Sequence, residues 1–103
     1  MVSFAEKYKG THPGRVLERE LKKRSLKQRP FALFIGEHPQ TLNAITKGKR
    51  RLGTALALKI EAKLGLEEGS LVLLQAFYEI EKAKEGQPSR TPDFSVLRKS
   101  LFL

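Results

Sequence analysis

The chain of 103 residues contains no cysteine and no tryptophan. The absence of cysteine excludes disulfide bonds, thiolate zinc sites and cysteine nucleophiles, and it is typical of a reducing compartment. The two histidines, His12 and His38, and the carboxylates do not show the HExxH spacing of a metal site. A glycine-rich phosphate loop is also missing. We therefore expect no enzymatic activity, no cofactor and no metal ion.

Long apolar segments are absent as well. The longest strongly apolar stretch spans residues 31–35, far short of the roughly 20 residues that a transmembrane helix needs. The first ten residues lack the apolar run of a signal peptide. These features predict a soluble, cytoplasmic protein that does not interact with a membrane.

Acidic residues are scarce in the first half of the chain. Residues 1–53 hold 13 Lys and Arg against 4 Asp and Glu, whereas residues 54–103 hold 7 of each kind. The net charge of +9 therefore belongs entirely to the first half. Such a surface favours a polyanionic partner, because neutralising phosphates releases condensed counterions. At this point nucleic acid, an anionic membrane surface and a basic face that serves only solubility are all open alternatives.

Helical signals run through the whole sequence, and no internal repeat or alternating strand pattern occurs. A hydrophobic content of 40% is sufficient for one small core. Proline and glycine signals predict five helices, at about residues 13–24, 27–35, 39–47, 54–64 and 68–84. We therefore expect an all-α domain over residues 12–85, with a loose N-terminal arm at 1–11 and a C-terminal tail at 86–103.

Apolar side chains at helical spacing predict the core. The expected core positions are Val16, Leu17, Leu21, Phe31, Ala32, Phe34, Ile35, Leu42, Ile45, Ala57, Ile60 and Leu64. The last helix has two adjoining apolar arcs, one with Leu71, Leu74 and Tyr78 and one with Leu73, Phe77 and Ile80. This apolar face is wider than one core contact needs, and the tail is also apolar. We therefore predict a dimer or partner interface that includes Leu71, Leu74, Phe77, Tyr78, Phe94 and Leu97.

Two short helices joined at Gly36 have the form of a helix-turn-helix, whose second helix enters the DNA major groove. Because Leu42 and Ile45 face inward, the side chains left for base edges are Gln40, Thr41 and Ala44, with His38 and Asn43 at the periphery. Gln28, at the start of the preceding helix, is positioned for a phosphate. The cations Lys47, Lys49, Arg50 and Arg51 follow the second helix and are candidates for backbone phosphates. Each signal alone also fits a solvated surface, but their coincidence favours DNA binding.

Several short motifs occur along residues 12–80. They are His12-Pro13-Gly14, Gln28, Gly36, Lys47-Gly48-Lys49-Arg50, Ala57-Leu58-Lys59-Ile60, Leu64-Gly65 and Leu74-Gln75-Ala76-Phe77-Tyr78. Their order and spacing resemble those of the HigA-type antitoxins of the Xre, phage-repressor-like class. The resemblance covers residues 12–80 and implies a five-helix dimer that binds a palindromic operator in its own promoter. It also implies neutralisation of a RelE-like toxin. By the same resemblance, Gln28 contacts a phosphate, and Pro39, Gln40, Thr41 and Ala44 occupy positions that face bases.

The sequence departs from this family at three places. Lys27 stands where the family prefers a serine cap, Pro30 replaces a common acidic residue, and His38-Pro39 is an unusual start for a recognition helix. Two other functions remain open: a stand-alone Xre-type regulator without a toxin, and a protein-interaction module whose basic face binds an acidic partner. Salt titration of DNA binding separates the second from the others, because phosphate contacts weaken steeply as salt rises.

Overall fold

The computed structural model describes residues 3–86. This part of the chain is entirely helical and contains α1 (Phe4–Lys7), α2 (Pro13–Lys23), α3 (Gln28–Phe34), α4 (Pro39–Thr46), α5 (Thr54–Leu64) and α6 (Ser70–Glu85). The prediction of an all-α fold is confirmed. The five predicted helices are present with ends close to those expected, and the described segment holds a sixth, α1, in addition.

Proline and glycine determine where several helices begin and end, as the sequence predicted. Pro13 and Pro39 stand in the first turns of α2 and α4, where a missing N–H costs nothing. Gly36 ends the turn between α3 and α4 with φ +75°, a conformation that most other residues avoid. Gly65 ends α5 in the left-handed region with φ +69°.

The N-terminal arm is not loose, and that prediction is wrong for residues 4–7, which form α1. The Ser3 side chain accepts a hydrogen bond from the Glu6 backbone N–H, which caps the helix. Ala5 is buried, and the Phe4 and Tyr8 rings lie 5.1 Å apart and pack against the core. A helix of one turn has no periodicity to detect, and its signals in the sequence are the capping-box spacing of Ser3 and Glu6 and the apolar spacing of Phe4 and Tyr8.

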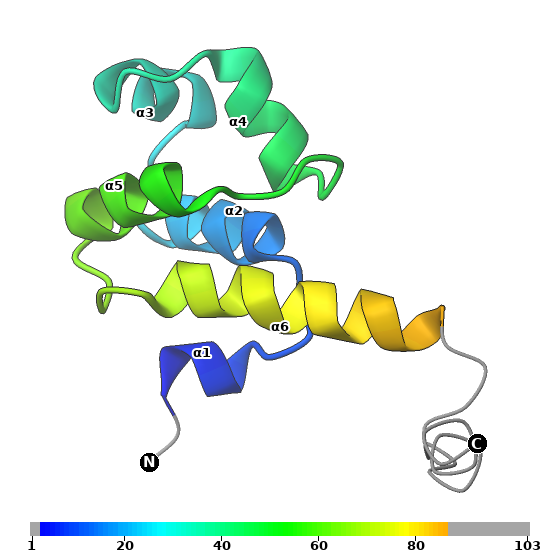
Figure 1. The fold of residues 1–103 in the computed structure, drawn as a ribbon. Coiled ribbons are helices and arrows are strands. Elements are labelled where there is room, and N and C mark those ends of the chain that lie inside the picture. The colour runs from blue at the N-terminus through cyan, green and yellow to red at the C-terminus, as the bar shows by residue number, and fades with distance from the viewer. Residues whose placement is uncertain (1–2, 87–103) are drawn as a thin grey trace, which may run out of the picture.

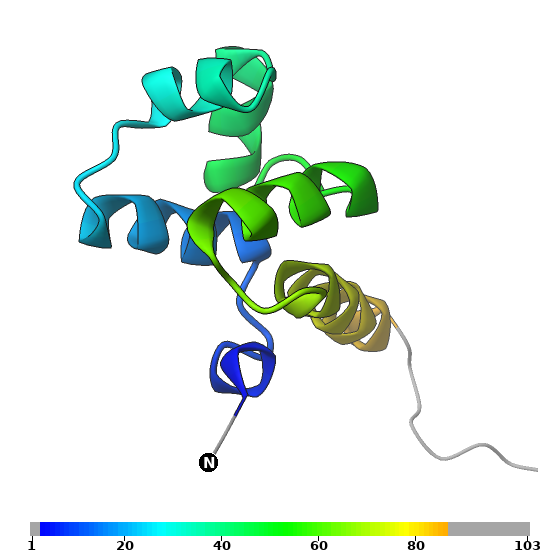
Figure 2. The same cartoon turned by 90° about the vertical axis from the view of Figure 1, so that its left-hand side faces the viewer.

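The helices of residues 3–86 are arranged in three levels (Figure 1). The α3–α4 pair lies at one end, α2 and α5 lie in the middle, and α6 lies at the other end with α1 beside it. The view turned by 90° shows the same order (Figure 2). α4 packs on both α2 and α3, whereas α6 packs on α1, α2 and α5. No helix within residues 3–86 combines the length and the apolar content that a bilayer crossing requires.

The core contains all of the predicted positions except one. Phe34 was expected inside, but 69% of its surface is exposed, because at the end of the seven-residue α3 its ring lies beside the Lys63 ammonium of α5 and not in the core. Leu52, in the loop between α4 and α5, is buried and was not predicted.

The predicted interface on α6 is wrong for two residues. Leu71 and Leu74 have no exposed surface, because they fill the core against α5 and α2. Their side chains are therefore not available to a partner. Phe77 and Tyr78 are half-buried, whereas Leu73 and Ile80 are each 49% exposed. The interface residues Phe94 and Leu97, like the predicted tail, lie outside the described residues.

Candidate nucleic-acid interface

The α4 helix presents one polar and one apolar face. Leu42 and Ile45 are buried, with exposures of 0% and 1%, and they anchor the helix on α2 and α3. Gln40 and Asn43 are exposed on the opposite side, and Thr41 is half-buried between the two faces. The anchoring residues thus fix the rotation of α4 and direct its hydrogen-bonding side chains to solvent.

The remaining predicted base-contact residues lie on or beside the same surface. His38 precedes α4 and is exposed, whereas Pro39 and Ala44 are half-buried. Neither His38 nor Lys27, which precedes α3, caps its helix with a side-chain hydrogen bond. Pro30 and Pro39 have no N–H, so the uncapped backbone N–H groups of the two first turns belong to Gln28, Arg29 and Gln40, and groups of this kind bind phosphate oxygens at other helix N-termini.

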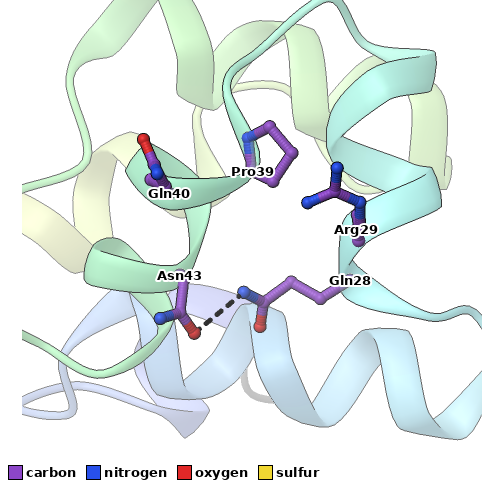
Figure 3. A pocket seen from close by; sticks show the side chains of 5 residues that line it. All are labelled: Gln28, Arg29, Pro39, Gln40 and Asn43. Carbon is purple, nitrogen blue, oxygen red and sulfur yellow. Dashed lines mark hydrogen bonds between the residues drawn. The ribbon is translucent and has the colours of Figure 1, made fainter.

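Gln28 joins α3 to α4 (Figure 3). Its Nε2 donates to Asn43 Oδ1 at 3.2 Å, and its Oε1 accepts from the Thr46 hydroxyl at 3.0 Å. Thr46 is itself buried. The Gln28 amide has two protons and uses one of them here, so the second is available for a phosphate. The sequence predicted the phosphate role for Gln28 but not this bridge, which sets the angle between the two helices.

A hollow of about 450 Å³ separates α3 from α4 on this side (Figure 3). Its lining consists of Gln28, Arg29, Pro39, Gln40 and Asn43. The sequence analysis missed Arg29, whose guanidinium extends from α3 toward α4. Its position directly after Gln28, in the first turn of a helix expected to cross the DNA backbone, was the signal that could have identified it. The hollow brings one cation and three amide side chains together.

The basic loop after α4 extends this surface. Lys47, Lys49 and Arg50 are exposed, and the carbonyl oxygen of Lys47 accepts a hydrogen bond from Arg15 at 3.3 Å. Because this bond links α2 to the end of α4, it holds the backbone of Lys47 in place. The structure therefore brings three of the four predicted loop cations to one end of α4.

Arg51 does not extend with the others. Its guanidinium donates from Nε and Nη2 to Glu79 Oε1 on α6, at 3.1 and 2.8 Å. The hydrogen bond from Arg51 holds the pKa of the Glu79 carboxyl below its ordinary value, and a second bond from Gln75 acts in the same direction. The pair uses two of the five guanidinium N–H groups and offsets part of the charge, so Arg51 offers a phosphate less than the other loop cations do.

The basic loop is held by two motifs from opposite ends of the domain, one with His12 and one with Gln75 and Tyr78. His12 is buried, its Nδ1 accepts from the Gly14 N–H at 2.9 Å, and its ring meets Tyr78 edge-on with centroids 4.8 Å apart. Burial lowers the pKa of His12, although a hydrogen bond with the Arg50 backbone opposes this effect. On α6, Gln75 Oε1 accepts a hydrogen bond from the Leu52 backbone N–H at 2.8 Å, which holds the end of the loop.

Gly14 allows the close approach of α2 to α4. A Cβ atom at this position would lie 1.7 Å from the carbonyl oxygen of Ile45. The first turn of α2 therefore packs directly on the backbone of the last turn of α4. His12-Pro13-Gly14 thus serves the fold by capping α2, beginning it and seating α4 against it.

The part of the chain that the structure describes has no group of three or more His, Asp or Glu side chains that could hold a metal ion. The hollow between α3 and α4 offers amide and guanidinium donors, and the loop adds ammonium and guanidinium groups. This set of groups suits hydrogen bonding to bases and to phosphate oxygens.

Comparison with known families finds one matching model, described as helix-turn-helix, over residues 17–71. The match covers just over half of the chain and includes α3, α4 and the basic loop. It does not include His12-Pro13-Gly14 or Tyr78. No curated protein matches the chain.

Proposed function

Because the chain belongs to the Xre-type helix-turn-helix family of DNA-binding transcription regulators, we propose that it is a sequence-specific repressor that inserts α4 into the major groove. One observation carries the proposal: α4 turns Gln40 and Asn43 to solvent while Leu42 and Ile45 hold it on the core. A major groove about 12 Å wide admits one helix and displays base edges to its side chains.

Each exposed group has a defined role in this proposal. Gln40 makes the bidentate contact to adenine that its amide geometry suits, and Thr41 and Ala44 contact a thymine methyl or a neighbouring base edge. His38 lies at the periphery of this contact, and Pro39 contributes only apolar surface because it has no N–H. The base contacts of α4 are thus carried by few hydrogen-bonding groups.

Phosphate contacts come from the elements on both sides of α4. Gln28 uses its second amide proton, and Arg29 adds a charge on the α3 side of the hollow. Lys47, Lys49 and Arg50 serve the opposite end, and Arg51 contributes less because Glu79 occupies part of its guanidinium. These contacts supply most of the affinity and none of the direct base discrimination.

We further propose a homodimer on a palindromic operator. The exposed side of α6 supports this, since Leu73, half-buried Phe77 and Ile80 recur at helical spacing and form one apolar stripe. Half-buried Tyr78 borders that stripe. Two-fold pairing through the stripe places the two α4 helices on half-sites about 34–36 Å apart, one turn of DNA.

The finer role that we propose is that of a cytoplasmic antitoxin that represses its own promoter and neutralises a RelE-like toxin. Its support is the resemblance to HigA-type antitoxins in motifs on both sides of the matched region, together with the contact between His12 and Tyr78 from two of them. A small RelE-like reading frame next to this one, and co-purification of its product, would support the antitoxin role. Without such a neighbour, a stand-alone regulator is the better description.

DNA binding is tested by fluorescence anisotropy with the upstream DNA of this reading frame, over a range of salt concentrations. Gln40→Ala should cost about 1–3 kcal/mol at one base pair and relax the preference there. Arg50→Ala should weaken binding to all sequences equally and lower the salt slope by about 1.

The matched control is Lys82→Ala, which removes the same charge from the last turns of α6 and should leave binding unchanged. If Gln40→Ala keeps the full operator preference, α4 is not the recognition helix. If no complex forms at modest ionic strength, or if added salt has no effect, the basic face serves a protein partner instead.

A further inference from the structure

A second surface lies on the outer side of α3, and the DNA-facing hollow does not include it. A groove of about 350 Å³ runs between α3 and the end of α5, with Leu26, Pro30, Phe31, Phe34 and Leu64 as its apolar lining. The groove and the hollow between α3 and α4 have no lining residue in common. An occupant of the groove therefore does not need the groups that contact DNA.

The apolar side chains on this surface are unusually exposed. Phe34 and Leu33 are 69% and 61% exposed, the highest values among large hydrophobic side chains in the described residues. Phe34 lines the groove, whereas Leu33 precedes it on α3 and is not part of the lining. Buried neighbours such as Phe31 keep the helix in place, so the fold does not need Leu33 or Phe34. Exposed apolar side chains at a groove of this kind are typical of an interaction site.

The charges at the groove have one sign. Its two charged lining residues are Lys27 and Lys63, and no carboxylate lines it in the described part of the chain. The Lys63 ammonium lies 5.0 Å from the centre of the Phe34 ring, so a cation stands directly over the most exposed apolar group. An occupant that covers Phe34 must therefore accept a positive charge at its edge.

We propose that this groove binds an amphipathic helix of a protein partner, with apolar anchors flanked by Asp or Glu. Apolar anchors at positions i, i+3 or i+4, and i+7 of such a helix fill a groove of this form, and its carboxylates pair with Lys27 and Lys63. A second copy of this chain fits less well, because a two-fold contact would bring the lysines of one copy toward those of the other. This inference does not rest on the proposed DNA binding.

The test is a selection on the full-length protein from displayed 16-residue helices, with one half of the library flanked by Asp and Glu and the other half by Lys. We expect only the acidic half to be enriched. Leu33→Ser combined with Phe34→Ser should weaken the selected peptides at least tenfold in fluorescence anisotropy. Lys63→Glu should do the same and should allow Lys-flanked peptides to bind.

Leu58→Ser is the matched control, because it removes an exposed leucine of α5 that does not line the groove and should leave peptide binding unchanged. Circular dichroism verifies that each variant keeps its helices. Equal enrichment of both halves, no enrichment, or binding that the double variant retains would each overturn the proposal. So would self-association that the double variant abolishes, or binding to phosphatidylglycerol vesicles that depends on Phe34.

Discussion

Replacing Gly14 by alanine tests how α2 supports α4. Gly14 is buried in the first turn of α2, and an ideal Cβ would lie 1.7 Å from the Ile45 carbonyl oxygen and 2.5 Å from its carbonyl carbon. Real Cβ contacts begin near 3.0 Å, so the two helices must separate by at least about 1.3 Å. The obstacle is backbone, which cannot rotate away as a flexible side chain can.

Two opposing effects decide the sign of the change in stability. Alanine has a higher helix propensity than glycine, which favours the variant by about 1 kcal/mol. Overpacking costs about 1–3 kcal/mol, and a clash with fixed backbone belongs at the upper end of that range. The hydrogen bond from Gly14 N–H to His12 lies beside the clash and is strained as well. We expect a net loss of about 2 kcal/mol, which corresponds to a fall in Tm of about 8–16 °C.

Thermal unfolding followed by circular dichroism measures this loss, and operator binding at low temperature measures the displacement of α4. Gly86→Ala is the control, because φ at Gly86 is −85° and the nearest atom to its Cβ would be at an ordinary 3.7 Å. This variant should unfold at the same temperature as the wild type or slightly above it. A Gly14→Ala protein as stable as the wild type would refute the close packing of α2 on α4.

Three further results are expected. Because folding lowers the pKa of His12, the unfolded chain takes up the proton first, so stability should fall below about pH 6.5 by at most 1.4 kcal/mol per pH unit until the folded pKa is passed. Urea titrations at several pH values should show this dependence, and His12→Asn should reduce it. Glu61→Gln should cost about 1–3 kcal/mol in urea unfolding, since the buried carboxylate accepts three backbone N–H groups at the start of α6; a loss below 0.5 kcal/mol would contradict this role. Arg51→Ala should change stability by less than about 1 kcal/mol, because its pair with Glu79 is exposed, and should weaken DNA binding less than Arg50→Ala; an equal effect on binding would contradict the smaller phosphate role of Arg51.

The sequence predicted elements whose signals are local. The stripe of Val16, Leu17 and Leu21 and the glycines that end the turns lie within a few residues of the structure they determine, and all appear where expected. The prediction that Phe34 is buried was wrong because α3 has only seven residues. These are too few for the helical period to distinguish the inner side of the helix from its outer side. Local pattern alone left that choice open.

Long-range contacts explain the other errors. Two apolar arcs on α6 predicted an unusually wide contact, but which arc faces the core depends in part on α1 and α2, which are far away in the sequence. The local pattern therefore made Leu71 and Leu74 as suitable for an interface as the other arc. The Arg51–Glu79 pair spans 28 residues, and a charge count cannot reveal which cation has a carboxylate beside it. For the site, exposure of Gln40 and Asn43 followed from periodicity, whereas the Gln28 bridge required the angle between two helices.

The motifs that identify the subfamily resemblance and the residues that would read DNA occupy different parts of the domain. His12, Gly14, Gln75 and Tyr78 gather behind the basic loop, where they brace its backbone and the end of α4. Gln40 makes none of these contacts and extends into solvent from the opposite face of α4. A substitution at Gln40 can therefore change the preferred base without disturbing the packing that positions the helix. Operator preference is then free to differ among proteins that keep the His12-Pro13-Gly14 motif and the motif with Gln75 and Tyr78. These two motifs therefore predict how α4 is held and not which DNA sequence it recognises.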